Sequence, residues 1–241
     1  MSNKLDTFIS FIDRSFALLS LTDGNIVSRP IHERELNNGL DHEITSITHI
    51  LNSNLLITGN LIGEINVWSV CSGSLIRVFQ AHSGRINSVC GIPNGCLVSG
   101  SNEFKLKVWN ITAQNPLIEK LIGHLGFNYS LSILPNGFLA SSDTDNQILI
   151  WDTTIFSLIK KVTSHFEIIN ALTILFTNQY LNNEKFLDKV KIWSKTGEEL
   201  TIIDSANKDS NIICICCIDN SYLATSDLNN NTIKIWHIVT G

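Results

Sequence analysis

The stretch Gly123–Asp152, which reads GHLGFNYSLSILPNGFLASSDTDNQILIWD, decides the fold. Turn residues at 135–137 and 143–146 interrupt it, and apolar residues alternate or cluster between them. Such short segments between turns predict β-strands rather than helices. They lie at residues 129–134, 138–142, 148–151 and, just after the stretch, 158–162. The stretch therefore predicts one unit of four short antiparallel strands.

The same unit recurs along the chain, marked by a tryptophan that closes a β-branched run. The tryptophans are 41, 42, 42 and 43 residues apart, at Trp68, Trp109, Trp151, Trp193 and Trp236. A period in the forties built from short strands predicts a repeat array. Helical spacing of apolar residues is not sustained, which disfavours an α-solenoid. In an array the repeated residues stack one unit on the next, so they say little about what the assembled surface binds.

Composition narrows the class of protein. The 241 residues carry a net charge of −5, with 17 Lys and Arg against 22 Asp and Glu, which offers no basic footprint for nucleic acid. No apolar segment approaches the roughly 18 residues that a membrane helix needs, and the first residues do not resemble a signal peptide. We expect a single domain in the cytoplasm or nucleus, with no membrane insertion and no nucleic-acid partner.

The six cysteines lack the regular framework of a disulfide-rich protein, so we expect reduced thiols. Strand alternation places Cys214 and Cys216 on one face and Cys217 on the other, and no histidine accompanies them. We therefore interpret the cysteines as small buried apolar residues, and we expect neither a metal nor a cofactor.

These features resemble the WD-repeat β-propeller family. The resemblance rests on Gly123-His124 and its relics Ala81-His82 and Ser164-His165, on Pro-Asn-Gly turns at 93–95 and 135–137, and on Trp151-Asp152. In these three units the histidine precedes the tryptophan by 27, 27 and 28 residues. The resemblance implies an all-β, six-bladed β-propeller of four-stranded antiparallel blades, formed by a single domain over residues 1–241. We expect the blades at about 1–40, 41–80, 81–122, 123–163, 164–204 and 205–241.

The first and last blades depart from this pattern. The first reads as three strands, at 8–12, 16–20 and 23–29, with Arg29 in the place of the tryptophan. The last has strands near 212–218, 221–226 and 232–238, and we expect it to lack its outer strand. The segment 232–238 would then be an exposed edge through which the chain could self-associate or meet a partner.

The resemblance also implies a buried hydrogen-bond network in the fourth blade, formed by His124, Ser141, Asp145 and Trp151. The same residues could be mistaken for a Ser-His-Asp triad. The other blades carry only parts of the set: Glu103 stands where the third blade needs its Asp, and the fifth has Asn183 and Leu187. Because a degraded stabilising device would leave such copies and an active site would not, we interpret the set as structural and expect no catalytic residues.

The function implied is that of a non-catalytic scaffold that presents one propeller face to a protein or peptide. The alternatives are binding of a small ligand or lipid headgroup in the central channel, and a propeller hydrolase. By register with the family, the residues expected to contact a partner are Arg85, Asn87, Asn102, Phe127, Tyr129, Thr144, Ile168, Asn170 and Phe186. A competing interpretation is that Phe127 and Ile168 only pack between blades.

Overall fold

The computed structural model describes residues 5–10, 16–22, 25–26, 42–50, 53–134, 136–162, 169–175, 179–184, 189–193, 199–204, 212–217, 222–227 and 232–237. Regular structure over these ranges consists of β-strands joined by turns. None of the described segments forms a helix long and apolar enough to cross a membrane.

The described strands form six antiparallel sheets, and each sheet joins strands that follow one another in the chain. The first comprises β1 (Leu5–Ser10), β2 (Phe16–Thr22) and β3 (Asn25–Ile26). The second comprises β4 (Ile44–His49), β5 (Leu55–Asn60), β6 (Glu64–Ser69) and β7 (Leu75–Gln80). The third comprises β8 (Ile86–Gly91), β9 (Leu97–Ser101), β10 (Lys105–Trp109) and β11 (Leu117–Ile122).

The remaining three sheets repeat the arrangement. The fourth comprises β12 (Asn128–Ile133), β13 (Leu139–Asp143), β14 (Ile148–Trp151) and β15 (Leu158–Val162). The fifth comprises β16 (Ile169–Leu175), β17 (Gln179–Glu184), β18 (Lys189–Trp193) and β19 (Glu199–Asp204). The sixth comprises β20 (Ile212–Cys217), β21 (Tyr222–Asp227) and β22 (Thr232–His237).

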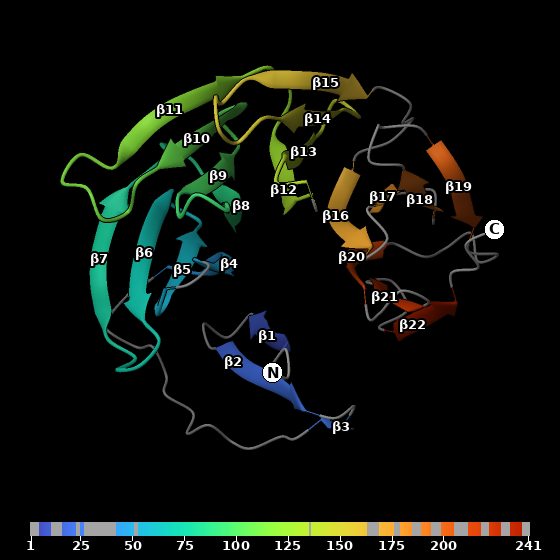
Figure 1. Cartoon of the computed structure of the whole chain (residues 1–241), viewed down its shortest axis with the longest axis horizontal. Helices are drawn as coiled ribbons and strands as arrows, with labels where there is room; N and C mark the ends of the chain where they lie inside the picture. The colour runs from blue at the N-terminus through green and yellow to red at the C-terminus, as the bar shows by residue number, and fades with distance from the viewer. Residues whose placement is uncertain are drawn as a thin grey trace.

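The sheets are arranged as blades around a common centre (Figure 1). The first strand of each sheet from the second to the sixth lies toward the centre, and β7, β11 and β15 lie at the rim. This confirms the expected all-β propeller with four-stranded antiparallel blades. That the complete ring has six blades within one domain stays a prediction.

The strands of the fourth and sixth blades lie within one residue of the expected segments, but the inner strand of the first blade does not. Its inner strand was expected at 8–12 and instead covers Leu5–Ser10. Its third strand is described at Asn25–Ile26, inside the expected segment 23–29, whose other residues lie outside the described ranges. This blade lacks the tryptophan that marks the register in the other blades, so its strands were predicted from the apolar pattern alone.

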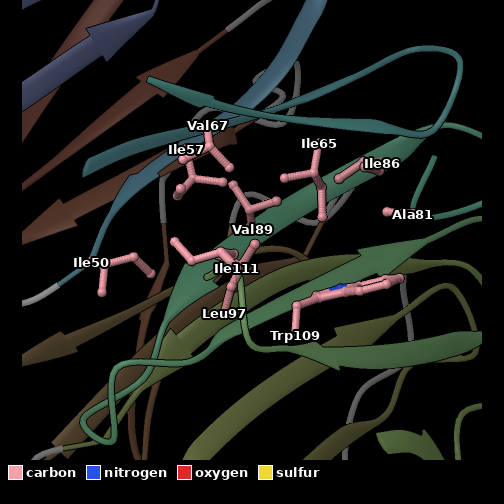
Figure 2. Close-up of a cluster of buried hydrophobic side chains, with 10 residues drawn as sticks. All are labelled: Ile50, Ile57, Ile65, Val67, Ala81, Ile86, Val89, Leu97, Trp109 and Ile111. Carbon is pink, nitrogen blue, oxygen red and sulfur yellow. The ribbon is translucent and has the colours of Figure 1, made fainter. Parts of the chain in front are cut away.

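Apolar side chains fill the space between neighbouring blades. Figure 2 shows the layer between the second and third sheets, where Ile57, Ile65 and Val67 meet Ile86 and Val89. Comparable layers lie between the third and fourth sheets and between the fourth and fifth. The core is therefore a series of inter-blade layers, as expected for a repeat protein whose units bury their faces on one another.

Hydroxyl groups also link the inner strands of successive blades. Three serines at a 42-residue spacing accept backbone N–H bonds from the next inner strand: Ser46 from Val89 at 2.8 Å, Ser88 from Leu131 at 3.2 Å and Ser130 from Leu172 at 3.1 Å. Each inner strand ends its sheet and has no ladder partner on the side of the centre. The serines satisfy buried N–H groups that the sheets leave unpaired.

Candidate functional site

The fourth blade contains a continuous chain of buried hydrogen bonds. Trp151 Nε1 donates to Ser141 Oγ at 2.8 Å, and Ser141 Oγ lies 2.6 Å from His124 Nε2. On the other side of the imidazole, Nδ1 lies 2.8 Å from Asp143 Oδ2. A neutral imidazole protonated on Nδ1 satisfies every one of these contacts. All four side chains are buried. Their hydrogen bonds connect the loop before the blade to its second and third strands.

The carboxylate in this chain belongs to Asp143, and the expectation of Asp145 was wrong. Asp143 ends β13 two residues after Ser141, so both side chains lie on the same face of the strand and point toward His124. Asp145 lies in the following turn, is exposed, and donates its backbone N–H to Asp143 Oδ1 at 3.0 Å. Burial of Asp143 favours the neutral acid, but hydrogen bonds from His124, Gln147 and Asp145 outweigh it and lower its pKa.

The third blade has a complete chain of the same kind, although only parts of one were expected. Trp109 Nε1 donates to Ser99 Oγ at 2.7 Å, and Ser99 Oγ lies 2.7 Å from His82 Nε2. His82 Nδ1 lies 2.9 Å from Glu103 Oε2. Ser101 occupies the place of Asp143 in this blade, and Glu103 reaches the imidazole from the turn because its side chain is one methylene longer than that of Asp.

Two other blades retain a shorter version. Trp68 Nε1 donates to Thr58 Oγ1 at 3.0 Å, and Trp236 Nε1 donates to Thr225 Oγ1 at 2.9 Å. The sequence has no histidine at the corresponding distance before either tryptophan. In the fifth blade, His165 and Leu187 lie outside the described residues, and only the backbone of Asn183 and Trp193 is described.

The Ser141–His124–Asp143 geometry matches a catalytic triad, but its surroundings do not suit catalysis. Ser141 is fully buried, and its oxygen already accepts the indole N–H of Trp151. A nucleophile must reach a substrate carbonyl, and this one faces packed side chains. We therefore interpret this hydrogen-bond network as one that stabilises the blade internally.

Partner contacts were expected at the mouth of the ring, on the face where loops enter the inner strands. Arg85 is exposed just before β8, and its carbonyl accepts the backbone N–H of Asn102 at 3.3 Å. Asn87 Nδ2 donates to Asn102 Oδ1 and to the carbonyl of Asn128, each at 2.7 Å. The structure thus brings Arg85, Asn87 and Asn102 together, and Asn87 links the third blade to the fourth.

The expected residues of the fourth blade lie beside them. Two hydrogen bonds of 3.0 Å join Phe127 and Thr144. Phe127 N donates to Thr144 Oγ1, and Thr144 N donates to the carbonyl of Phe127. Tyr129 is half-buried in β12. For the fifth blade, Ile168 and Phe186 lie outside the described residues, and Asn170 is described only as backbone of β16.

A further aromatic residue, Phe104, was missed. Its ring stacks on that of Phe127, with 5.3 Å between centroids and 23° between planes, and the two side chains remain 44% and 39% exposed. The contact joins the turn after β9 to the loop before β12, so Phe127 does pack between blades while staying accessible. We name Phe104 and Phe127 the aromatic pair.

The backbone of Phe104 is unusual. It has a φ of 64°, in the left-handed region, and the equivalent turn positions in the neighbouring blades hold Gly63 at 87° and Asn146 at 62°. All three stand five residues before a tryptophan, where the later repeats have Asp188 and Asn231. Gly, Asn and Asp tolerate this conformation, whereas Phe pays about 1–2 kcal/mol for it. An aromatic residue at this register was the signal in the sequence that could have revealed the site.

The described residues do not suggest a metal site or a reactive thiol. Among the described residues, no group of three or more His, Cys, Asp or Glu side chains could hold a metal ion. Cys71, Cys90 and Cys96 are free thiols, and burial raises the pKa of Cys90 to about 12, which makes it a poor nucleophile.

A segment that runs from the last strand of the second blade through the first three strands of the third matches a known family. Residues 73–110 match the family described as "WD domain, G-beta repeat". The solved structure of the Mitotic Checkpoint Complex includes a chain that superposes with a TM-score of 0.76 at 18% identity, over 98% of this chain and 71% of that one. The solved structure of U3-55K gives a TM-score of 0.75 at 18% identity, over 84% and 63%. The chain carries a WD repeat and has the β-propeller fold.

Curated relatives of this WD-repeat propeller align over shorter segments. "WD repeat and SOCS box-containing protein 1" of Takifugu rubripes is 33% identical over 72 residues, which is 29% of this chain and 17% of the relative. "Nuclear distribution protein PAC1" of Arthroderma otae is 26% identical over 100 residues, which is 37% of this chain and 22% of the relative. The chain thus matches less than a quarter of the length of these relatives. WD40 repeats generally act as scaffolds for protein interaction, and the family is typically non-catalytic.

Proposed function

We propose that this propeller is a non-catalytic interaction module that binds a protein or peptide on the face carrying the aromatic pair. Arg85 and Asn102 contribute the polar part of the contact, and the rings of Phe104 and Phe127 contribute its apolar centre. By register with the family, the proposed surface also includes Ile168, Asn170 and Phe186 of the fifth blade. The observation that carries the proposal is the left-handed backbone of Phe104.

Strain of this kind supports a role in binding because nothing in the fold requires it. The turn forms with Gly63 in the second blade and Asn146 in the fourth, so an aromatic residue is not needed to make it. Residues held in strained backbone conformations gather at ligand-binding sites, where contact of the side chain with another molecule offsets the strain.

The chemistry of the surface supports the same conclusion. Aromatic and arginine side chains are the residue types that dominate binding energy at protein interfaces. Here they stand on loops held by the rigid ends of two blades, and the bonds of Asn87 to Asn102 and Asn128 fix those blades relative to each other. A preorganised site of this kind loses little side-chain entropy on binding.

The proposal is tested by comparing the proteins that co-purify with the intact chain and with Phe104→Asn. Relief of about 1–2 kcal/mol of backbone strain offsets the loss of a ring contact worth about 0.5–1.5 kcal/mol, so this variant keeps its stability. We expect it, and Arg85→Ala, to lose the partners that the natural sequence retains.

The matched control is Ile155→Asn, which removes an exposed apolar side chain from the turn between β14 and β15, at the opposite end of the blade. This variant should keep all partners. Retention of every partner by Phe104→Asn and Arg85→Ala, or their loss only from Ile155→Asn, would place the binding surface elsewhere.

A further inference from the structure

Strand β22 ends the sixth sheet, whose order is β20-β21-β22. In the second to fifth sheets the third strand hydrogen-bonds to a fourth strand, which is β7, β11, β15 or β19. Over the ranges that the structure describes, β22 pairs with β21 alone. That pairing runs from Thr232 to His237 without a bulge, so the outer edge of the strand is straight. A straight edge is a template for another strand.

The side chains of β22 are exposed where those of the complete blades are buried. Ile233 and Ile235 are 75% and 68% exposed. The residues at the same distance from the blade tryptophan are 0–5% exposed in the three preceding blades with described side chains: Ile65 and Val67, Leu106 and Val108, and Ile148 and Ile150. An apolar surface that is covered in these blades is open in the sixth.

We propose that β22 pairs antiparallel with β22 of a second copy of this chain, with Ile235 opposite itself. The pairing joins two sixth sheets into one continuous sheet across a two-fold axis. It makes no use of the aromatic pair, so it stands independently of the proposed function.

The register follows from strand geometry. In an antiparallel pair, two opposite residues are either both hydrogen-bonded to each other or both not. Residues that present their N–H and C=O groups to the same edge alternate along a strand. When two copies of one strand pair through the same edge, one residue must therefore lie opposite its own copy across the two-fold axis. Centring the pair on Lys234 would set two lysines directly opposite each other, which is unfavourable. Centring it on Trp236 would leave only residues 235–237 in register. Centring it on Ile235 pairs residues 233–237.

This register suits a second copy because every pair in it is compatible. Ile235 meets Ile235, Lys234 lies opposite Trp236, and Ile233 lies opposite His237. The two lysines become diagonal neighbours about 7–8 Å apart instead of direct opposites, which weakens their repulsion. The β-branched residues also match the composition of paired strands.

The test measures the mass of the intact chain by sedimentation velocity over a range of concentrations. The natural sequence should form a dimer that dissociates on dilution. Because residue 235 lies opposite itself, Ile235→Lys and Ile235→Glu should each weaken the dimer by about tenfold or more, through repulsion between like charges. An equimolar mixture of the two variants should recover the dimer. A chain that stays monomeric at all concentrations, or variants that dimerise unchanged, would overturn the proposal.

Covalent trapping gives a second measurement that tolerates weak association. In a Cys71→Ser background, Ile235→Cys should form an intermolecular disulfide on mild oxidation, because opposite strand residues lie within the Cα separation that a disulfide spans. The matched control is Ile118→Cys, on the outer strand β11, which is also exposed. Equal cross-linking at the two positions would indicate random collision and overturn the pairing.

Discussion

Glu103 lies two residues beyond the position that Asp143 occupies in the next blade, yet each carboxylate receives the Nδ1–H of its own blade's histidine. His82 bonds to Glu103 at 2.9 Å, and His124 bonds to Asp143 at 2.8 Å. The longer side chain of Glu103 makes up for its more distant backbone. The two blades therefore reach one hydrogen-bond network by different residues, which makes the network open to substitution experiments.

The first prediction concerns the length of the Glu103 side chain. Glu103→Asp should destabilise the fold by about 1–3 kcal/mol, because the shorter carboxylate leaves the buried imidazole of His82 without its acceptor. Adding Ser101→Asp supplies a carboxylate at the position of Asp143 and should recover most of the loss. Urea midpoints with unchanged slope provide the measurement. Failure of the double variant to recover would mean that the carboxylate position is not interchangeable between blades.

The second prediction compares the blade tryptophans. Trp151→Ala and Trp109→Ala should each cost about 3–5 kcal/mol, because both empty a buried site and leave a serine without its donor. Trp236 is only half-buried, and among the described residues its bond to Thr225 is not part of a longer network, so Trp236→Ala should cost less. By the sequence, Trp193→Ala should also cost less than Trp151→Ala. Equal losses at Trp151 and Trp236 in chemical denaturation would contradict this order.

The third prediction concerns pH. Burial lowers the pKa of His82 to about 4, although the bond to Glu103 opposes the shift. The unfolded chain, with a histidine pKa near about 6.5, therefore binds a proton that the folded chain excludes, and stability falls as the pH drops from about 6.5 toward 4. At pH 5 the loss from this residue should be about 2 kcal/mol.

The variant His82→Asn isolates this contribution. It starts from a lower stability at neutral pH but should show a smaller decrease between pH 6.5 and pH 5 than the natural sequence. Hydrogen bonds from Ser83, Lys107 and His82 overcome the effect of burial and lower the pKa of Glu103, so this carboxylate stays ionised over the same range. Parallel curves for the two proteins would show that His82 is not protonated on unfolding in this range.

The fourth prediction concerns the serines between inner strands. Ser88→Ala should cost about 1–3 kcal/mol because it leaves the N–H of Leu131, a buried residue, without an acceptor. Ser46→Ala should cost a similar amount through Val89. The two sites adjoin, because the N–H that Ser46 accepts belongs to Val89, the residue that follows Ser88. We therefore expect the loss in the double variant to differ from the sum of the two single losses by about 0.5–3 kcal/mol. Strictly additive losses would show that the two bonds act independently.

Much of the fold follows from the sequence because the apolar period and the tryptophan register both act through backbone geometry. Residues 129–134 and 148–151 alternate or cluster as strands must, and β12 and β14 lie there. Where the tryptophan is missing, as in the first blade, the period alone placed the inner strand three residues late. The position of the blade tryptophan, rather than the composition of a segment, therefore predicts where the strands of this fold lie.

The site was less accessible to the sequence for two physical reasons. The family resemblance, which places the carboxylate in the turn, implied Asp145, whereas the direction of a side chain depends on strand alternation, which selects Asp143. The aromatic pair depends on the φ of Phe104 and on a contact between blades, and neither is visible in a single repeat. The role of Ser88 cannot be seen in the sequence of its own blade, since its bond to Leu131 crosses to the next blade.

The last prediction transfers the strain of Phe104 to the next blade. Asn146→Phe should cost about 1–2 kcal/mol, because the turn at this position also requires a left-handed backbone that Phe adopts reluctantly. Asn146→Gly is the matched control and should have little effect, since Gly63 makes the same turn at a φ of 87°. Thermal and urea unfolding of the two variants measure the difference. If Asn146→Phe were as stable as Asn146→Gly, the left-handed turn would carry no cost for an aromatic residue, and the conformation of Phe104 would no longer indicate a binding site.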